Sequence, residues 1–471
     1  MTDSIAAHPD RLLPADPGTR RIARELLAEV EGLPILSPHG HVPADWIAED
    51  TPFPDPTALL VSPDHYVTRL VHASGRSLAE LRVGGTDDVD SRTAWRTFAE
   101  AWPLFDGTAS GYWLRSEFEH VFGLPSAVVD RLQDHADASY DAIAAKLAEP
   151  GFRPRQLFRD FGIEVLATTD DPLDSLEPHA LIAKDESFPG RVLPTFRPDA
   201  YLNVAHPAWA QNVDRLTAEA ADGAAGYTGY LRALENRRRH FIEHGAVSAD
   251  HGVRTPLTLK LGRAEAEALF EKARRGEATA KDRDVFEAHM MYEMARMSVE
   301  DGLVMTVHPG SSRNHHGPTF ERFGADTGHD IPFGIGYTEA VKPLLQDFGT
   351  AEGFHLVLFT LDETVFSREL APLAGFYPSV YLGAPWWFLD APDAMLRFRS
   401  AVTETAGFSR SSGFIDDTRA FCSIPARHDT ARRVEASFLA RLVAEHRITE
   451  ARAHEIIVDL IDAAPRRVFK L

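Results

Sequence analysis

The sequence predicts an α/β fold, a distorted (β/α)8 TIM barrel with a mostly helical insertion after the first strand. Three observations lead to this prediction. The chain contains eight short apolar runs, helical patterns lie between several of them, and one connection is far longer than an ordinary βα loop. Short apolar runs that alternate with helices are typical of parallel βα units, and eight such units close into a barrel.

The apolar runs are the predicted barrel strands, although the first and fourth are weak signals when taken alone. Long helical patterns separate several of them, for example over residues 209–243 and 255–301. In chain order the predicted strands are Leu33–Ser37, Ile163–Thr168, Arg191–Phe196, Gly245–Ala249, Leu303–His308, His355–Thr360, Ser379–Gly383 and Gly413–Asp416.

The connection between the first two runs is too long for a βα loop. It covers residues 42–160 and is rich in helix formers and aromatic residues. Loops that follow barrel strands lie at the C-terminal face of a barrel, so we expect this insertion to lie over the barrel mouth. The predicted organisation is therefore residues 1–41 (N-terminal helix and first strand), 42–160 (insertion) and 161–471 (remainder of the barrel).

Composition limits the partners and the compartment. A net charge of −21 over 471 residues argues against non-specific binding to nucleic acid or to an anionic membrane. The single cysteine, Cys422, excludes an internal disulfide and favours a reducing, cytoplasmic location. No secretory signal is apparent, and prolines interrupt the uncharged run 370–389, which argues against a membrane span. We expect a small-molecule substrate and a homo-oligomer.

Polar residues of catalytic type follow most of the predicted strands. Each has an ordinary structural explanation by itself, such as a helix cap for an aspartate or a core position for a tryptophan. In a barrel, however, they all project to one mouth, and this joint placement favours a site. These residues are His39, His41, Asp170, Asp171, Arg197, Asp199, Asp250, His251, His308, Arg313, Trp386, Trp387, Asp417 and Arg419.

The spacing of the first histidines predicts a metal site. His39 and His41 are one residue apart, so an extended strand would place both side chains on the same face. Together with Asp417 after the eighth run, they give three ligands and leave open positions, which suits a catalytic, zinc-like ion. The fourth run has no lysine at its end that could bridge two metals, so we expect one divalent ion, Zn²⁺.

The chain resembles the uronate isomerase (glucuronate/galacturonate isomerase) family of the amidohydrolase superfamily nearly from end to end. The motifs are weak individually but specific in this order: "LLPADPGTRRIARELLAEVEGLPILSPHGHV", "DHYVTRL", "TTDDPLDSL", "FRPD", "ADHG", "VHPGSSRN", "GADTGHD", "PWWF" and "DDTRAFCSIPARH". The sequence departs from the family pattern at Ser37-Pro38, at Pro309, at His315 and His316, and at "TRAF". These departures affect the expected substrate preference more than the reaction type.

The resemblance implies a (β/α)8 barrel, a metal held by His39, His41 and Asp417, and aldose–ketose isomerisation of hexuronates. The expected reactions are D-glucuronate to D-fructuronate and D-galacturonate to D-tagaturonate. Family positions also map onto His65, Tyr66, Arg197, Trp386, Trp387 and Arg419.

The expected chemistry moves a proton between C2 and C1 through a metal-stabilised cis-enediolate. Asp417 is the first candidate for the base, and His65 with Tyr66 is the rival acid–base pair. Substrate binding is assigned to six residues: the arginines suit a distal carboxylate, the tryptophans can exclude water, and His308 is either a fourth metal ligand or an electrophile. The six are Arg197, Arg419, Trp386, Trp387, His308 and Arg313.

Other functions are compatible with parts of the pattern. The same ligands and barrel can support a metal-dependent hydrolase of the lactonase or amidohydrolase type, a decarboxylase, or an isomerase of a related sugar acid, because a fold does not determine its chemistry. A non-enzymatic sugar-acid binding protein would be expected to lack the metal ligands or the acid–base groups, yet His39, His41 and Asp417 are all present. The sequence leaves open the preferred epimer, the native metal and the oligomeric state.

Overall fold

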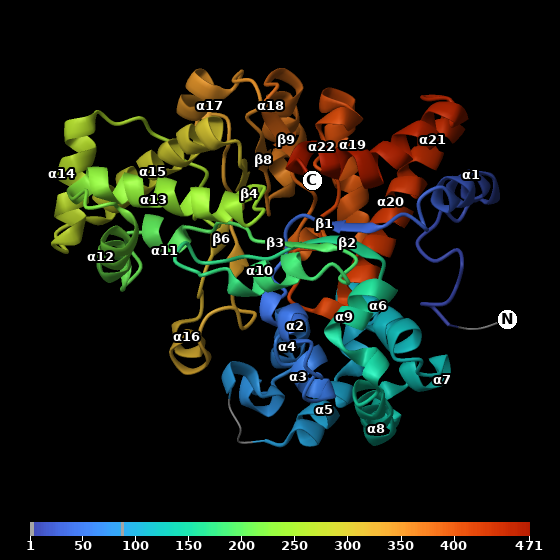
Figure 1. Cartoon of the computed structure of the whole chain (residues 1–471). Coiled ribbons are helices and arrows are strands. Elements are labelled where there is room, and N and C mark those ends of the chain that lie inside the picture. The colour runs from blue at the N-terminus through green and yellow to red at the C-terminus, as the bar shows by residue number, and fades with distance from the viewer. Residues whose placement is uncertain (1–3, 86–88) are drawn as a thin grey trace.

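Parallel strands form the barrel wall in the computed structural model, which describes residues 4–85 and 89–471 (Figure 1). The order is β1-β2-β3 in one sheet and β4-β5-β8-β9 in a second. Isolated bridges from Phe196 to Asp170 and to Ala249 connect the two sheets. The wall strands are β1 (Ile35–Ser37), β2 (Ile163–Ala167), β3 (Arg191–Leu193), β4 (Ser248–His251), β5 (Val304–Val307), β8 (Leu356–Leu358) and β9 (Val380–Leu382).

The predicted eighth strand is wrong as a regular strand. Residues 413–416 have no strand assignment, and Gly413 has a φ of 77°, which an extended ladder does not accommodate. An isolated bridge from Leu382 to Ser411 connects this segment to β9, and the backbone N–H of His41 donates to the carbonyl of Thr418 at 3.0 Å. These contacts close the wall, so the fold is the expected (β/α)8 barrel in a distorted form.

The other seven apolar runs coincide with strands, with small differences in their ends. The largest difference is at the fourth run, where β4 begins at Ser248 and continues to His251. Asp250 and His251 therefore lie within the strand rather than after it. Every residue of β4, β5, β8 and β9 is buried. Burial of both faces explains why β5, β8 and β9 are largely apolar in the sequence, whereas β4 consists of small and polar residues.

The connection from β1 to β2 is mostly helical, as predicted, and its helices gather in the lower half of Figure 1. Aromatic residues such as Trp95, Phe98 and Trp102 form much of its own core. That residues 42–160 form a separate domain over the barrel mouth stays a prediction. The helices are α2 (Ala44–Glu49), α3 (Pro56–Leu60), α4 (His65–Ala73), α5 (Ser91–Glu100), α6 (Ala109–Ser116), α7 (Ser126–Val129), α8 (Ala136–Leu147) and α9 (Pro154–Asp160).

Long helices surround the barrel, and each of the two predicted helical regions, 209–243 and 255–301, contains two of these helices. Among the described residues, no helix is both long enough and apolar enough to cross a bilayer. The longer helices are α1 (Pro17–Ala28), α12 (Trp209–Ala220), α13 (Gly226–Glu243), α14 (Arg263–Arg274), α15 (Ala280–Asp301), α19 (Pro392–Ala406), α20 (Ile424–Ala444) and α21 (Glu450–Val458).

The connection from β5 to β8 is an excursion that reaches the site. It contains a short antiparallel pair, β6 (Ser311–Ser312) and β7 (Ile331–Pro332), with α16 (Gly317–Phe323) between them. The backbone of this excursion carries Arg313 and Asp326 to the rim of the pocket described below.

Candidate active site

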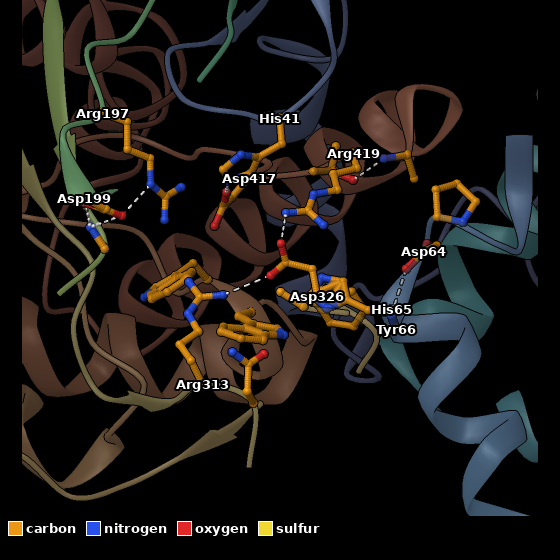
Figure 2. Close-up of a pocket in the computed structure, with 18 of the residues that line it drawn as sticks. His41, Asp64, His65, Tyr66, Arg197, Asp199, Arg313, Asp326, Asp417 and Arg419 are labelled. Carbon is orange, nitrogen blue, oxygen red and sulfur yellow. Dashed lines mark hydrogen bonds and ion pairs between the residues drawn. The ribbon is translucent and has the colours of Figure 1, made fainter. Parts of the chain in front are cut away.

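A cavity of about 440 Å³ lies where the strand ends, the insertion and the β5–β8 excursion meet (Figure 2). This volume is within the range of small-molecule sites. Of the eleven residues given a catalytic, substrate-binding or metal-binding role from the sequence, nine line it: His41, His65, Tyr66, Arg197, Arg313, Trp386, Trp387, Asp417 and Arg419. The other two, His39 and His308, are buried beside it.

Two histidines and an aspartate meet at one side of the cavity. His39 and His41 follow β1, and Asp417 follows the irregular closing segment. The Nε2 atoms of His39 and His41 lie 3.3 Å and 2.9 Å from Oδ1 of Asp417. One ligand atom from each residue lies within 4.8 Å of the other two. Imidazole nitrogen and carboxylate oxygen are the donors that zinc-like ions prefer, so the residues fit a divalent metal.

Asp417 has the electrostatics of a cation-binding position. Burial raises the pKa of this carboxyl group, but the neighbouring His39 and His41 outweigh burial and hold the pKa well below its usual value. Oδ1 is buried, and its near polar neighbours are the two imidazole Nε2 atoms, which are themselves metal-ligand atoms. The backbone φ of 42° is in the left-handed region, which is strained for a residue other than glycine.

His308 belongs to a second group of possible ligands, together with His39 and Asp250. Nδ1 of His308 is 2.5 Å from Oδ1 of Asp250, and the His308 ring stacks on His39 with centroids 4.7 Å apart. Nε2 of His308 is buried and has no hydrogen-bond partner in the described structure. Because His308 lies beside His39 and not among the residues that line the cavity, its position suits a metal ligand better than a substrate contact.

Arg197 is fixed from both sides near the metal-ligand group. Its Nε donates to Asp199 at 2.7 Å, and Nη1 lies 3.6 Å from Oδ2 of the buried Asp250. Gly252 allows this position, because a Cβ there would lie 2.4 Å from Nη2 of Arg197 and 2.7 Å from Asp199 Oδ2. An added Cβ would therefore force the guanidinium group and its carboxylate partner to shift.

Replacing Gly252 with alanine should displace the head of Arg197 and raise KM for an acidic substrate by about tenfold, the effect of losing roughly one charge-assisted hydrogen bond. Steady-state kinetics checks this. Gly262→Ala is the matched control, because a Cβ added at Gly262 would meet nothing within 4 Å and its KM should not change. An unchanged KM in Gly252→Ala would contradict the role of this approach.

On the opposite rim, Asp326 joins two arginines (Figure 2). Nη1 of Arg313 lies 3.2 Å from Oδ1 of Asp326, and Nη2 of Arg419 lies 2.8 Å from Oδ2. Burial raises the pKa of Asp326, but Arg419 and Arg313 outweigh it and keep the pKa at about 2. The carboxylate stays ionised at neutral pH and orients both guanidinium groups at the cavity.

His65 and Tyr66 begin helix α4, whose first turn is capped by the Asp64 side chain accepting from the N–H of Tyr66 at 2.8 Å. Burial, together with the charge of Arg419, lowers the pKa of His65 to about 3. Burial and the adjacent Asp390 raise the pKa of Tyr66 well above its usual value. At neutral pH His65 is therefore uncharged and Tyr66 keeps its phenolic proton.

The two tryptophans form an apolar wall of the cavity. Trp386 and Trp387 are 5% and 6% exposed, and the Arg313 guanidinium lies 5.1 Å from the Trp387 ring centroid. Nε1 of Trp386 is buried without a partner in the described structure, so it is an available donor. The φ angles of 37° at Trp387 and 23° at Phe388 show a strained backbone at this wall.

Asp199 and Asp250 were grouped with the strand-end residues from the sequence but were given no role, and the structure places both against Arg197. Three further residues, Asp326, Asp390 and Arg427, were not singled out. Asp326 stands inside "GADTGHD", but nothing in that motif indicates a bridge between two arginines. Asp390 and Arg427, which contact Tyr66, are brought to the site only by the fold.

Comparison with known proteins agrees with this geometry. The family model for glucuronate isomerase matches residues 18–469. The chain belongs to the glucuronate isomerase family. A curated uronate isomerase from Corynebacterium efficiens is 59% identical over the full length of both chains, and one from Rhizorhabdus wittichii is 50% identical over 99% of each.

Solved structures of family members share the whole fold. The glucuronate isomerase of Caulobacter crescentus superimposes with a TM-score of 0.95 at 47% identity, covering 99% of this chain and 97% of that one. The uronate isomerase of Thermotoga maritima gives 0.90 at 29% identity, covering 98% and 99%. The fold and the family expected from the sequence are therefore confirmed.

Proposed function

We propose that this protein is a hexuronate isomerase that interconverts D-glucuronate with D-fructuronate and D-galacturonate with D-tagaturonate. The observation that carries the proposal is the cavity in which His41 and Asp417, with the buried His39 beside them, face arginines across a volume suited to one monosaccharide. Family membership supports the same reaction class. A hydrolase on the same barrel is less favoured, because the family match extends over nearly the entire chain.

The reaction moves a proton from C2 of the aldose to C1 and a second proton from the C2 hydroxyl to the C1 carbonyl oxygen. A divalent metal, which we propose to be Zn²⁺, would be held by His39, His41 and Asp417 and would supply a Lewis acid for the substrate oxygens. Asp417 is the proposed base for C2. Asp417 is preferred for its place in the metal-ligand group and not for its basicity, since His39 and His41 hold its own pKa well below the usual value; His65 and Tyr66 are the rival acid–base pair.

The substrate carboxylate is proposed to bind the arginines, and the tryptophan wall to exclude water from the reacting carbons. Arg197, Arg313 and Arg419 all line the cavity, and each is oriented by an acidic partner. The planar guanidinium group can bind a carboxylate through two parallel hydrogen bonds, which lysine cannot reproduce.

Arg197→Lys and Arg419→Lys should each raise KM for a hexuronate by about tenfold or more, because one charge-assisted hydrogen bond contributes about 1.5–3 kcal/mol. Initial-rate kinetics over a range of substrate concentrations measures this. Arg322→Lys on α16 is the control, since Arg322 is exposed and does not line the cavity. Unchanged kinetics in both variants would reassign the two arginines to structural ion pairs.

The proposed function is tested by a turnover screen with defined metal over hexuronates, pentoses and uronolactones. We expect conversion of a hexuronate to its ketouronate and no comparable activity on the other two classes. Hydrolysis of a uronolactone without isomerisation of any hexuronate would support the hydrolase instead. The cytoplasmic location and the homo-oligomer stay predictions; the buried, free Cys422 agrees with a reducing compartment.

A further inference from the structure

The hydroxyl group of Tyr66 is turned towards a buried carboxylate behind the cavity. Tyr66 Oη lies 3.1 Å and 3.0 Å from Oδ1 and Oδ2 of Asp390 and donates its hydrogen bond to this carboxylate. Asp390 follows the Trp386–Trp387 wall, is 5% exposed and is not among the residues that line the cavity. Asp390 can therefore reach a substrate only through its two partners that line the cavity, Tyr66 and Arg427.

Arg427 keeps Asp390 as a hydrogen-bond acceptor. Its Nη1 donates to Oδ2 of Asp390 at 2.9 Å. The guanidinium group is buried and lies 3.7 Å from the ring centroid of Trp113 and 5.1 Å from that of Tyr66. Burial raises the pKa of Asp390 to about 6, while Arg427 and the Tyr66 hydrogen bond oppose the rise, so the carboxyl group is mostly ionised at neutral pH and has no proton to donate. The phenol must therefore be the donor in the Tyr66–Asp390 contact.

The direction of this hydrogen bond determines whether the Tyr66 hydroxyl acts as a donor or as an acceptor towards the cavity. A phenol has one hydroxyl proton, and in Tyr66 this proton is used in the hydrogen bond that the hydroxyl donates to Asp390. The phenol oxygen keeps lone pairs, and Tyr66 lines the cavity, so its oxygen can accept a hydrogen bond there.

We propose that Asp390, held by Arg427, is a positioning residue that turns the Tyr66 hydroxyl so that its oxygen accepts a hydrogen bond from a hydroxyl group of the bound sugar acid. The proposal rests on the proposed isomerase function. When a carbonyl group forms at C2, the hydroxyl on that carbon loses its proton and the former C1 carbonyl oxygen gains one, so the oxygen protons balance. An acceptor beside that hydroxyl stabilises the change more than it stabilises the ground state, so the effect should appear in kcat.

Asp390→Asn removes the negative charge and one of the two acceptors with little change in shape. The asparagine oxygen serves Arg427 at the position of Oδ2, and the amide nitrogen takes the position of Oδ1, 3.1 Å from the Tyr66 hydroxyl. Its N–H competes with the phenol as a donor, so the carboxylate that held the phenol proton is lost. The variant therefore separates the orientation of the hydroxyl from its presence, which Tyr66→Phe removes altogether.

The test is a double-mutant cycle with Asp390→Asn, Tyr66→Phe and both together, assayed on a hexuronate. Asp390→Asn should lower kcat by about tenfold or more and change KM by less than about threefold. In the Tyr66→Phe background the same substitution should change kcat by less than about twofold, since the group through which it acts is gone. The exposed Asp393→Asn, three residues along the chain, is the control and should leave kcat unchanged.

Unfolding free energies measured on the same four proteins report the contact itself. The two substitutions could have non-additive effects on the unfolding free energy while Asp390→Asn lowers kcat equally with and without the Tyr66 hydroxyl. That result would make the contact purely structural and overturn the proposal. An unchanged kcat in the single variant Asp390→Asn would overturn the proposal as well. Failure of the wild-type protein to isomerise any hexuronate would instead overturn the proposed function, so the two failures are distinguishable.

Discussion

Replacing Asp417 with asparagine should lower the turnover of a hexuronate by more than about 100-fold, the usual scale for a general base. The amide cannot accept the C2 proton, and it is also a poorer ligand than the carboxylate. Steady-state kinetics measures the loss, and elemental analysis of the same preparation shows how much of it follows from metal loss. Retained metal together with the full loss of turnover would assign Asp417 to the proton step.

The control for this variant is Asp171→Asn. Asp171 also follows a barrel strand, but its side chain is exposed and does not line the cavity. Its removal should leave turnover within about twofold of wild type, as expected for a surface substitution away from the site. Substantial activity in Asp417→Asn would show that the base is elsewhere, with His65 and Tyr66 the next candidates.

Removal of a histidine ligand should have a comparably large effect. His39→Ala and Asp417→Ala should each lose most of the bound divalent metal, because only two of the three ligands remain. Elemental analysis after removal of free metal measures this, and circular dichroism checks that the barrel is still folded. His72→Ala, an exposed histidine on α4, should keep full metal. Full occupancy in both site variants would exclude the assigned metal site.

The fold was predictable where local signals and tertiary structure agree. β5 and β8 are short, buried and apolar, and the sequence shows them as uninterrupted runs between turns. The closing segment was predicted incorrectly because its geometry depends on partners. Gly413 is in a left-handed conformation, and the segment is held by the bridge at Ser411 and by the contact between His41 and Thr418. An apolar run alone does not encode those contacts.

The site was predictable to the extent that it is built from strand ends. Parallel strands present their carboxyl ends at one face, so His41, Arg197 and Asp417 could be grouped from the chain alone. The groups that orient the site residues could not be predicted in this way. Asp326 and Arg419 are 93 residues apart in sequence, and Tyr66 and Asp390 are 324 apart. Such pairs depend on how the excursion and the insertion fold over the barrel.

The most direct test is conversion of D-glucuronate in D2O, with NMR detection of the ketouronate and of deuterium at its C1. We expect a ketouronate that carries some deuterium at C1, because the proton removed from C2 exchanges in part with solvent before it returns. Asp417→Asn should form this product more than about 100-fold more slowly. Strictly zero deuterium in the product, together with substantial activity of Asp417→Asn, would contradict both the proton-transfer route and the assigned base.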